Sequence, residues 1–252
     1  MLIAACGNVV NDIFDEENDR LNNKIKAGFS RQKAINWFFL LFIITLGLAF
    51  YISKAINQVY LSSIALIAIG CLILYSKVLQ RKVLLGNFIV SLFVAFVPGI
   101  VWYAERTSYN ALQESNPSGH EYLTIILSAY MVFAFIANMF REIVKDIEDV
   151  KGDELSGYRT IAVAWGVKRS KFVALFYGGF LFVLELCWAI FNPLNQSMIE
   201  LILFFIMIIV PTIAAISRTH KSRSILDFRK SSQTIKIVMG LGLLYLFLIN
   251  MI

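Results

Sequence analysis

Seven apolar runs of roughly bilayer-spanning length limit what this chain can fold into. Each run is close to the ~20 residues that a helix needs to cross a hydrocarbon core of about 30 Å. They lie near residues 34–53, 58–76, 86–104, 122–140, 171–191, 198–217 and 234–252. The chain is 58% hydrophobic with a mean hydropathy of +0.71, which excludes a soluble domain of this length. We therefore predict an all-α polytopic membrane bundle with seven full spans.

The beginning of the chain predicts a further, incomplete span. Residues 1–10 are apolar and lead directly into acidic residues, so we interpret them as the second half of an eighth span. A helix of that length covers only about 15 Å, half of the hydrocarbon core. We therefore expect residues 1–252 to form a single, N-terminally truncated transmembrane domain that lacks its first helix. About 30 to 45 residues upstream would supply that helix, a short turn and the missing half-span.

The basic residues predict an orientation. Apart from Lys54 and Arg106, every Lys and Arg lies in one of four alternate loops, at residues 15–35, 77–85, 141–171 and 218–236. The positive-inside rule makes these four loops cytoplasmic and places residues 107–119 outside. The net charge of +6 is thus a signal of membrane topology, and we predict no nucleic-acid partner.

The cysteine and histidine residues predict no metal site and no disulfide framework. Cys6, Cys71 and Cys187 stand singly in apolar runs, so no disulfide framework or metal spacing can be read from them. His120 and His220 stand alone in polar loops, which excludes a His-Glu-x-x-His zinc site. Glu185 is the one acid well inside a span. We interpret it as structural, although an intramembrane carboxylate is also a functional candidate.

Two acidic stretches follow apolar runs and are the strongest functional signal. In the first, Asn11, Asp15 and Asp19 would lie within about 80° on a helix, with Asp12 about 20° beyond. In the second, Asp146, Asp149 and Asp153 would lie within about 60°. Both stretches border loops predicted to be cytoplasmic. If the two faces meet, their mutual repulsion calls for cations, and carboxylate oxygens suit Mg²⁺.

The simpler interpretation is that these acids lie at helix ends exposed to water, but this interpretation fits the sequence poorly. Both stretches follow their apolar runs and so lie at helix C-termini, where the helix dipole disfavours anions by a few tenths to about 1 kcal/mol. Solvation alone would favour Lys or Arg at these positions.

The paired pattern resembles the signature of the UbiA-type intramembrane prenyltransferases. The two motifs are Asn11-Asp12-x-x-Asp15-x-x-x-Asp19 and Asp146-x-x-Asp149-x-x-x-Asp153. Residues 141–153 are similar to the archaeal-type digeranylgeranylglyceryl phosphate synthase branch, and residues 74–87 fit the basic third loop of the superfamily. The resemblance covers essentially the whole chain.

The resemblance implies an enzyme of the prenyltransferase class and a nine-helix bundle around a polar cavity. The cavity would open to the cytoplasm and laterally to lipid, in an integral protein of the cell's inner or plasma membrane. Mg²⁺ held by the two motifs would bind an allylic prenyl diphosphate, and a lipid or aromatic acceptor would capture the prenyl cation. The acceptor would be of the geranylgeranylglyceryl phosphate type, or a 4-hydroxybenzoate or quinone precursor.

The resemblance also implies roles for particular residues. Asp12, Asp15, Asp146 and Asp149 would be catalytic. The metal-linked set would be Asn11, Asp12, Asp15, Asp19, Asp146, Asp149 and Asp153. The diphosphate would contact Tyr75, Lys77, Arg81, Arg141 and Lys145.

The chain departs from the family pattern in two places. Only ten residues precede the first motif, where the family has a full span and half of another. The family usually follows its first motif with an Asn-x-Pro-x-Arg-Pro-like turn, whereas residues 21–28 contain no proline. The loop over the site is therefore expected to be shorter.

Other functions remain as alternatives. A CDP-alcohol phosphotransferase also carries Asp-rich membrane helices, but its Asp-Gly and Ala-Arg elements are missing near the first cluster. A cation transporter or a non-catalytic membrane subunit is the non-enzyme alternative. Transport sites usually lie near the membrane midplane, whereas these carboxylates lie at span ends.

Overall fold

The computed structural model describes residues 2–22, 30–191 and 197–249, and these residues form helices and no strand. Lys24 and Lys26 of the first basic loop, and the last three residues of the seventh run, lie outside the described residues. The elements are α1 (Leu2–Phe14), α2 (Glu16–Leu21), α3 (Arg31–Ala55), α4 (Leu61–Lys77), η1 (Leu79–Arg81), α5 (Leu85–Ala104), α6 (Arg106–Ser115), α7 (Pro117–Leu155), α8 (Ile161–Phe191), α9 (Met198–Phe204), η2 (Phe205–Ile209), α10 (Val210–Lys221) and α11 (Ile225–Ile249).

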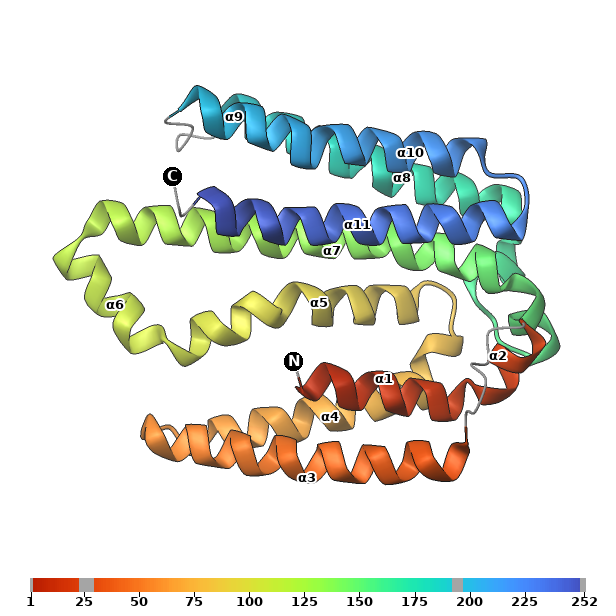
Figure 1. The fold of residues 1–252 in the computed structure, drawn as a ribbon, viewed down its shortest axis with the longest axis horizontal. Helices are drawn as coiled ribbons and strands as arrows, with labels where there is room; N and C mark the ends of the chain where they lie inside the picture. Colours follow the sequence, from red (N-terminus) through yellow and green to blue (C-terminus); the bar gives the residue numbers. More distant parts are fainter. Residues whose placement is uncertain (1, 23–29, 192–196, 250–252) are drawn as a thin grey trace. The chain divides into compact units, whose positions relative to one another are not determined.

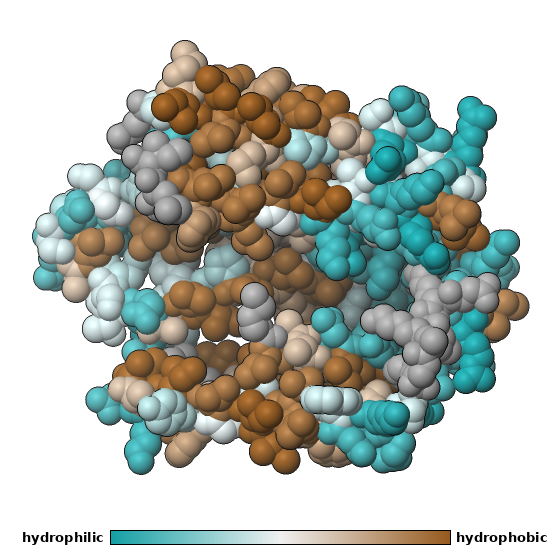
Figure 2. Space-filling model, in the orientation of Figure 1, coloured by the Kyte–Doolittle hydropathy of each residue, from teal (hydrophilic) through white to brown (hydrophobic). Residues whose placement is uncertain are grey.

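Seven helical segments in the described part of the chain are long and apolar enough to cross a membrane. They correspond one by one to the seven apolar runs, with α9, η2 and α10 together forming the sixth. Figure 2 shows hydrophobic side chains over the middle stretches of the helices and hydrophilic side chains at their ends. The predicted polytopic helical bundle is confirmed, and the protein is an integral membrane protein.

The chain divides into two compact units, and the first comprises residues 1–86 and 151–160. Here α1 packs against both α3 and α4, which also contact each other (Figure 1). Gly7 permits the close approach of α1 to α4, because a Cβ atom there would lie 2.9 Å from Leu72 Cδ1. Small residues serve this purpose at helix contacts in membranes. Cys6 is fully buried in the same layer, with its Sγ 3.6 Å from Thr45 Oγ1.

The second unit comprises residues 87–150 and 161–252. Its core joins α7 to α8 and α11 through side chains that include Ile136, Leu181 and Met239. The Tyr130 hydroxyl of α7 donates a hydrogen bond to the Gly242 carbonyl of α11 at 2.7 Å, and these two helices run side by side in Figure 1. Most of α7 belongs to this unit, whereas its last turn belongs to the first unit.

Several elements differ from their predicted bounds. Helix α7 continues fifteen residues beyond the predicted span end at residue 140, because polar residues extend it beyond the apolar run. Helix α8 starts at Ile161 rather than near residue 171, and it is interrupted by Gly166, whose φ of 79° is readily adopted only by glycine. The predicted outer loop contains α6, and one π-helical turn, η2, precedes Pro211.

Candidate active site

The first acidic stretch does not form the single helix that its spacing predicts. Helix α1 ends at Phe14, and Asp15 has φ −94° and ψ 4° before α2 begins at Glu16. The backbone bonds Asp15 N to Asn11 O, at 2.8 Å, and Asp19 N to Asp15 O, at 2.7 Å, nevertheless continue the helical pattern. The acidic stretch is therefore a bent pair of helices, with Asn11 and Asp12 before the bend and Asp19 after it.

Asp15 is held by two side-chain amides. Asn11 Nδ2 donates to Asp15 Oδ2 at 2.7 Å, and Gln80 Nε2 of η1 donates to Asp15 Oδ1. Ser76 Oγ at the end of α4 donates to Asn11 Oδ1 at 3.3 Å. The amide groups are neutral, so they orient the carboxylate and leave its negative charge in place.

Ser76 and Gln80 both bond to the first acidic stretch, so the segment that carries Tyr75, Lys77 and Arg81 lies against that stretch.

The last turn of α7 brings a member of the second motif to the first. Asn18 Nδ2 of α2 donates to Asp153 Oδ1 at 2.8 Å, and Thr160 Oγ1 donates to Asp153 Oδ2 at 3.0 Å. Asp153 and Asn18 are 3% and 7% exposed, so these hydrogen bonds are almost fully shielded from water. Each carboxylate oxygen of Asp153 thus accepts a hydrogen bond from a different segment, which fixes the orientation of the carboxylate.

A glycine ends α7 and reverses the chain toward this cluster. Gly157 has a φ of 73°, Tyr158 N donates to Asp153 O at 2.8 Å, and Gly157 N donates to Glu154 O at 3.2 Å. This pair of bonds is the Schellman motif, which satisfies carbonyl groups at a helix end. The motif places Tyr158 immediately after the turn, where its side chain is 7% exposed.

Tyr158 lies among charged groups from three segments. The Arg81 guanidinium lies over its ring, 4.5 Å from the centroid, and Arg159 N donates to the Arg81 carbonyl at 3.0 Å. Burial raises the pKa of the Tyr158 hydroxyl, the charges of Asp15 and Asp153 raise it further, and Arg81 acts in the opposite direction. The hydroxyl therefore stays protonated at neutral pH. Arg81 Nε is buried and has no hydrogen-bond partner among the described residues.

Gly152 allows the two acidic stretches to approach. Its backbone N–H donates to Asn22 Oδ1 at 3.1 Å, and a Cβ atom there would overlap Asn22 Nδ2 and Asn18 Oδ1. Asn22 Nδ2 donates to Asn18 Oδ1 at 3.1 Å, and Asn18 in turn binds Asp153, so a methyl group at Gly152 would displace the network.

We expect Gly152→Ala to lower the free energy of unfolding by about 1–3 kcal/mol, the usual range for overpacking a filled site. Thermal unfolding of the purified protein in detergent measures this change. Gly47→Ala is the matched control, since nothing lies within 4 Å of a Cβ built on Gly47 in α3. Equal melting temperatures for the two variants would show that the contact at Gly152 is not tight.

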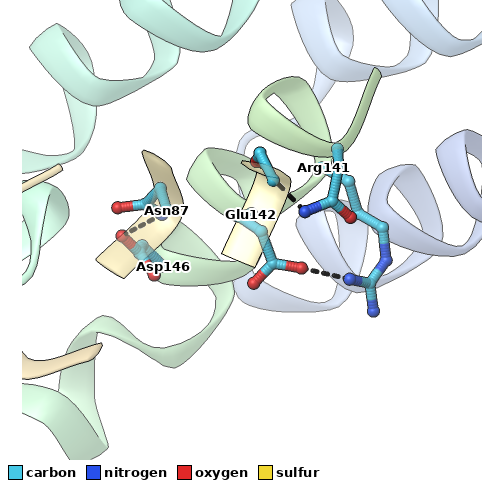
Figure 3. Close-up of polar contacts among 6 residues, drawn as sticks. Asn87, Arg141, Glu142 and Asp146 are labelled. Carbon is cyan, nitrogen blue, oxygen red and sulfur yellow. Dashed lines mark hydrogen bonds and ion pairs between the residues drawn. The ribbon is translucent and has the colours of Figure 1, made fainter. Parts of the chain in front are cut away.

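The rest of the second motif lies in the second unit, on α7. Asn87 Nδ2 of α5 donates to Asp146 Oδ2 at 3.0 Å, and Arg141 forms an ion pair with the adjacent Glu142 (Figure 3). Asp146 therefore has an amide partner, as Asp15 does. Arg141 Nε is buried without a hydrogen-bond partner among the described residues.

Three further charged residues of α7 belong to the second unit. Asp149 and Lys145 are half-buried, and Glu148, which is 6% exposed, pairs with Arg229 Nε of α11 at 3.0 Å. This ion pair connects the C-terminal part of α7 to the N-terminal part of α11 in the second unit.

The oxygen donors of the two motifs suit Mg²⁺, although the described residues of either unit alone do not form a complete set of metal ligands. Among the described residues, no three His, Cys, Asp or Glu side chains are grouped so that they could hold a metal ion. All predicted ligands carry oxygen donors, which Mg²⁺ prefers, and this ion usually binds one or two protein carboxylates together with substrate phosphates and water. Asp15 and Asp146, each oriented by amide donors, fit that mode.

Sequence reasoning missed the residues that bind the carboxylates or surround them. They are neutral polar side chains and one aromatic residue, namely Asn18, Asn22, Gln80, Asn87, Tyr158 and Thr160. The signal available for Asn18 was its place between Asp15 and Asp19. No periodicity marks the others, because their roles depend on contacts between distant segments.

Comparisons with known proteins identify the family. Residues 1–245 match the UbiA prenyltransferase family. The digeranylgeranylglyceryl phosphate synthase of Saccharolobus solfataricus is 30% identical over 95% of this chain and 81% of its own length. The synthase of the same name from Korarchaeum cryptofilum is 29% identical over 96% and 80%. The one from Sulfurisphaera tokodaii is 30% identical over 69% of this chain, a match that spans little more than half, 57%, of that protein.

No solved structure matches the chain. The sequence resemblance to the prenyltransferases is confirmed by the family match and by these relatives, which extend over most of the chain. The enzyme class implied by that resemblance, a prenyltransferase, is confirmed as well. The chain belongs to the UbiA prenyltransferase family.

Proposed function

We propose that this protein transfers a prenyl group from an allylic prenyl diphosphate to a lipid acceptor, with Mg²⁺ as cofactor and diphosphate as the second product. The relatives are named digeranylgeranylglyceryl phosphate synthases, which favours a geranylgeranylglyceryl phosphate-type acceptor over an aromatic one. A 4-hydroxybenzoate or quinone precursor is the second candidate.

One observation carries the proposal. Within the first unit, carboxylates from both acidic motifs, Asp15 and Asp153, lie around Tyr158 together with Arg81. The buried Nε–H of Arg81 has no partner among the described residues, and an arginine N–H of this kind is suited to a phosphate oxygen. A site that combines carboxylates with an unsatisfied arginine donor suits a Mg²⁺-bound diphosphate.

The proposed ligands of Mg²⁺ are the oxygen donors of both motifs: Asn11, Asp12, Asp15, Asp19, Asp146, Asp149 and Asp153. When bound, Mg²⁺ would neutralise the diphosphate and so stabilise the charge that develops on its oxygens. The amide groups of Asn11, Gln80 and Asn87 hold the carboxylates in place for this role.

The basic and aromatic residues bind the substrate in this proposal. Arg81 and Arg141 donate to diphosphate oxygens, with Tyr75, Lys77 and Lys145 as further contacts. The bond between the allylic carbon and the diphosphate oxygen breaks, and the electron pair leaves with the diphosphate. The acceptor hydroxyl oxygen then attacks the allylic cation and releases its proton. Burial of Asp153 and Tyr158 keeps water away from this side of the cluster.

Product analysis tests the proposed function. The purified protein, reconstituted in lipid, is incubated with Mg²⁺, geranylgeranyl diphosphate and either geranylgeranylglyceryl phosphate or 4-hydroxybenzoate. We expect mass spectrometry to find one added geranylgeranyl group on the glycerophosphate acceptor. Prenylated 4-hydroxybenzoate alone would favour the aromatic candidate, and the absence of any prenylated product from a wider acceptor panel would contradict prenyl transfer.

We also propose that both motifs face the cytoplasm. Cysteines introduced at Ser30 and Leu155 should react with a membrane-impermeant maleimide in inside-out vesicles, and a cysteine at Ser115 of α6 should react in right-side-out vesicles. The native cysteines are replaced by serine as the background. Reaction of the Ser30 and Leu155 positions from opposite sides would contradict a shared site.

A further inference from the structure

A second polar contact joins α5 to α7, deeper in the span than the contact that holds Asp146. Asn138 Nδ2 of α7 donates a hydrogen bond to Ser91 Oγ of α5 at 3.1 Å. Ser91 and Asn138 are 0% and 3% exposed, and both belong to membrane-spanning helices of the second unit. Polar side chains inside a membrane span are costly, and neither residue has a part in the reaction proposed above.

The two contacts lie on matching faces of the same pair of helices. On α5, Ser91 follows Asn87 by about one helical turn. On α7, Asn138 precedes Asp146 by eight residues, which places the two within about 80° of each other and about 12 Å apart along the axis. Asn87 Nδ2 donates to Asp146 Oδ2 at 3.0 Å, and Asn87 is 6% exposed (Figure 3). We call these four residues the polar seam; one of its two hydrogen bonds ends on a proposed metal ligand.

Stability alone gives little reason for the bond between Asn138 and Ser91. Hydrogen bonds between membrane helices stabilise them only modestly, and replacing both partners by apolar groups of the same shape is often nearly neutral. What the bond adds is a fixed register of the two helices, because it is lost once donor and acceptor separate beyond about 3.5 Å. An apolar contact such as that of Phe88 with Phe135, whose ring centroids are 5.4 Å apart, tolerates more sliding.

The register of α5 determines where Asn87 lies. Asn87 and Ser91 are one turn apart on a continuous helix, so a slide that breaks the Ser91 bond moves Asn87 by the same amount. The bond from Asn87 to Asp146 would lengthen as well, and the carboxylate would lose a group that orients it. Loss of such a partner typically lowers the metal affinity of a site by about 10–100-fold.

We propose that Ser91 and Asn138 are positioning residues, which hold α5 against α7 in the register in which Asn87 orients Asp146 for Mg²⁺. They touch neither the metal nor the substrate and act through Asn87. The inference rests on the proposed function for the role of Asp146 as a metal ligand, whereas the register itself does not depend on that role.

Metal-dependent binding tests the proposal. The protein in lipid nanodiscs is titrated with MgCl₂, and binding of radiolabelled geranylgeranyl thiodiphosphate, an unreactive substrate analogue, is measured without acceptor. We expect Ser91→Ala to raise the Mg²⁺ concentration for half-maximal binding by about threefold to tenfold, less than the loss of a direct partner of a ligand. An unchanged Mg²⁺ requirement in this variant would overturn the proposal.

A double variant separates positioning from packing. Ser91→Ala alone leaves the Asn138 amide without its acceptor and should lower the melting temperature. Ser91→Ala combined with Asn138→Leu makes both partners apolar, so the melting temperature should recover while the Mg²⁺ requirement stays raised. Phe135→Leu is the control for packing, because it should lower the melting temperature and leave the Mg²⁺ requirement unaltered. A Mg²⁺ requirement that recovers together with the melting temperature in the double variant would show a purely structural role.

Cross-linking tests the register without any ligand. Phe88→Cys and Phe135→Cys are introduced together, the native cysteines are replaced by serine, and a short bis-methanethiosulfonate reagent is added. We expect the cross-link to form more slowly when Ser91→Ala and Asn138→Leu are also present, and equal rates would overturn the proposal. Slower cross-linking, together with no Mg²⁺-dependent binding in the unmodified protein, would contradict the proposed function and leave the register role supported.

Discussion

Replacing Asp15 by Asn is expected to lower the turnover of prenyl transfer by at least ~10²-fold, the scale for one electrostatic stabiliser of a transition state. The substitution preserves size but removes the charge that would bind Mg²⁺. It also leaves one oxygen for the two amide donors, Asn11 Nδ2 and Gln80 Nε2, that now bind separate oxygens of Asp15. Initial rates at saturating prenyl diphosphate, followed by product mass, measure the effect.

A neighbouring acid provides the control for this variant. Glu17 is exposed on α2 and is absent from the network around Asp153, so Glu17→Gln should keep turnover within about twofold of the unmodified protein, as for most surface changes. Both variants should elute as the same monodisperse species in detergent. Turnover of Asp15→Asn close to that of Glu17→Gln would contradict a direct role for Asp15.

Removal of divalent metal is expected to abolish activity. Treatment with EDTA should reduce the rate by at least ~10²-fold, because the diphosphate would then leave without a cation to stabilise its charge. Addition of MgCl₂ should restore the rate. Asp146→Asn should need more Mg²⁺ for half-maximal activity than the unmodified protein, because it loses one anionic ligand while Asn87 keeps a partner.

A matched surface variant distinguishes this effect from general damage to α7. Glu154→Gln changes an exposed acid on the same helix and should leave the Mg²⁺ requirement unaltered. Full activity of the unmodified protein in excess EDTA would contradict the metal-dependent mechanism, even if the product is the predicted one.

The number and position of the spans were predictable because each is a long apolar run, and lipid permits few backbone structures. Their ends were less predictable. The extension of α7 to Leu155 consists of polar residues whose helical state depends on contacts such as Glu148 with Arg229. The interruption of α8 at Gly166 left no hydropathy signal, because glycine is also common inside membrane helices.

The acidic residues of the candidate site were predictable from their spacing, whereas the residues that hold them were not. Asp15 and Asp153 each belong to a motif whose members repeat at helical intervals, and charged residues beside an apolar run are easily recognised. Asn18 and Thr160 are separated by more than a hundred residues yet bind the same carboxylate, which no local pattern reports. The bend at Asp15 is likewise invisible to a calculation that assumes one straight helix.

The Schellman turn at the end of α7 sets a rule for changes in chain length. One residue inserted between Asp149 and Asp153 would rotate everything beyond it by about 100° and carry Asp153 and Tyr158 away from Asn18 and Arg81. Four inserted residues would rotate the end by only about 40° and lengthen the helix by about 6 Å. A change in length at this end of α7 therefore keeps the direction of Asp153 only when it approaches a whole helical turn, and even then it shifts the residue along the helix axis.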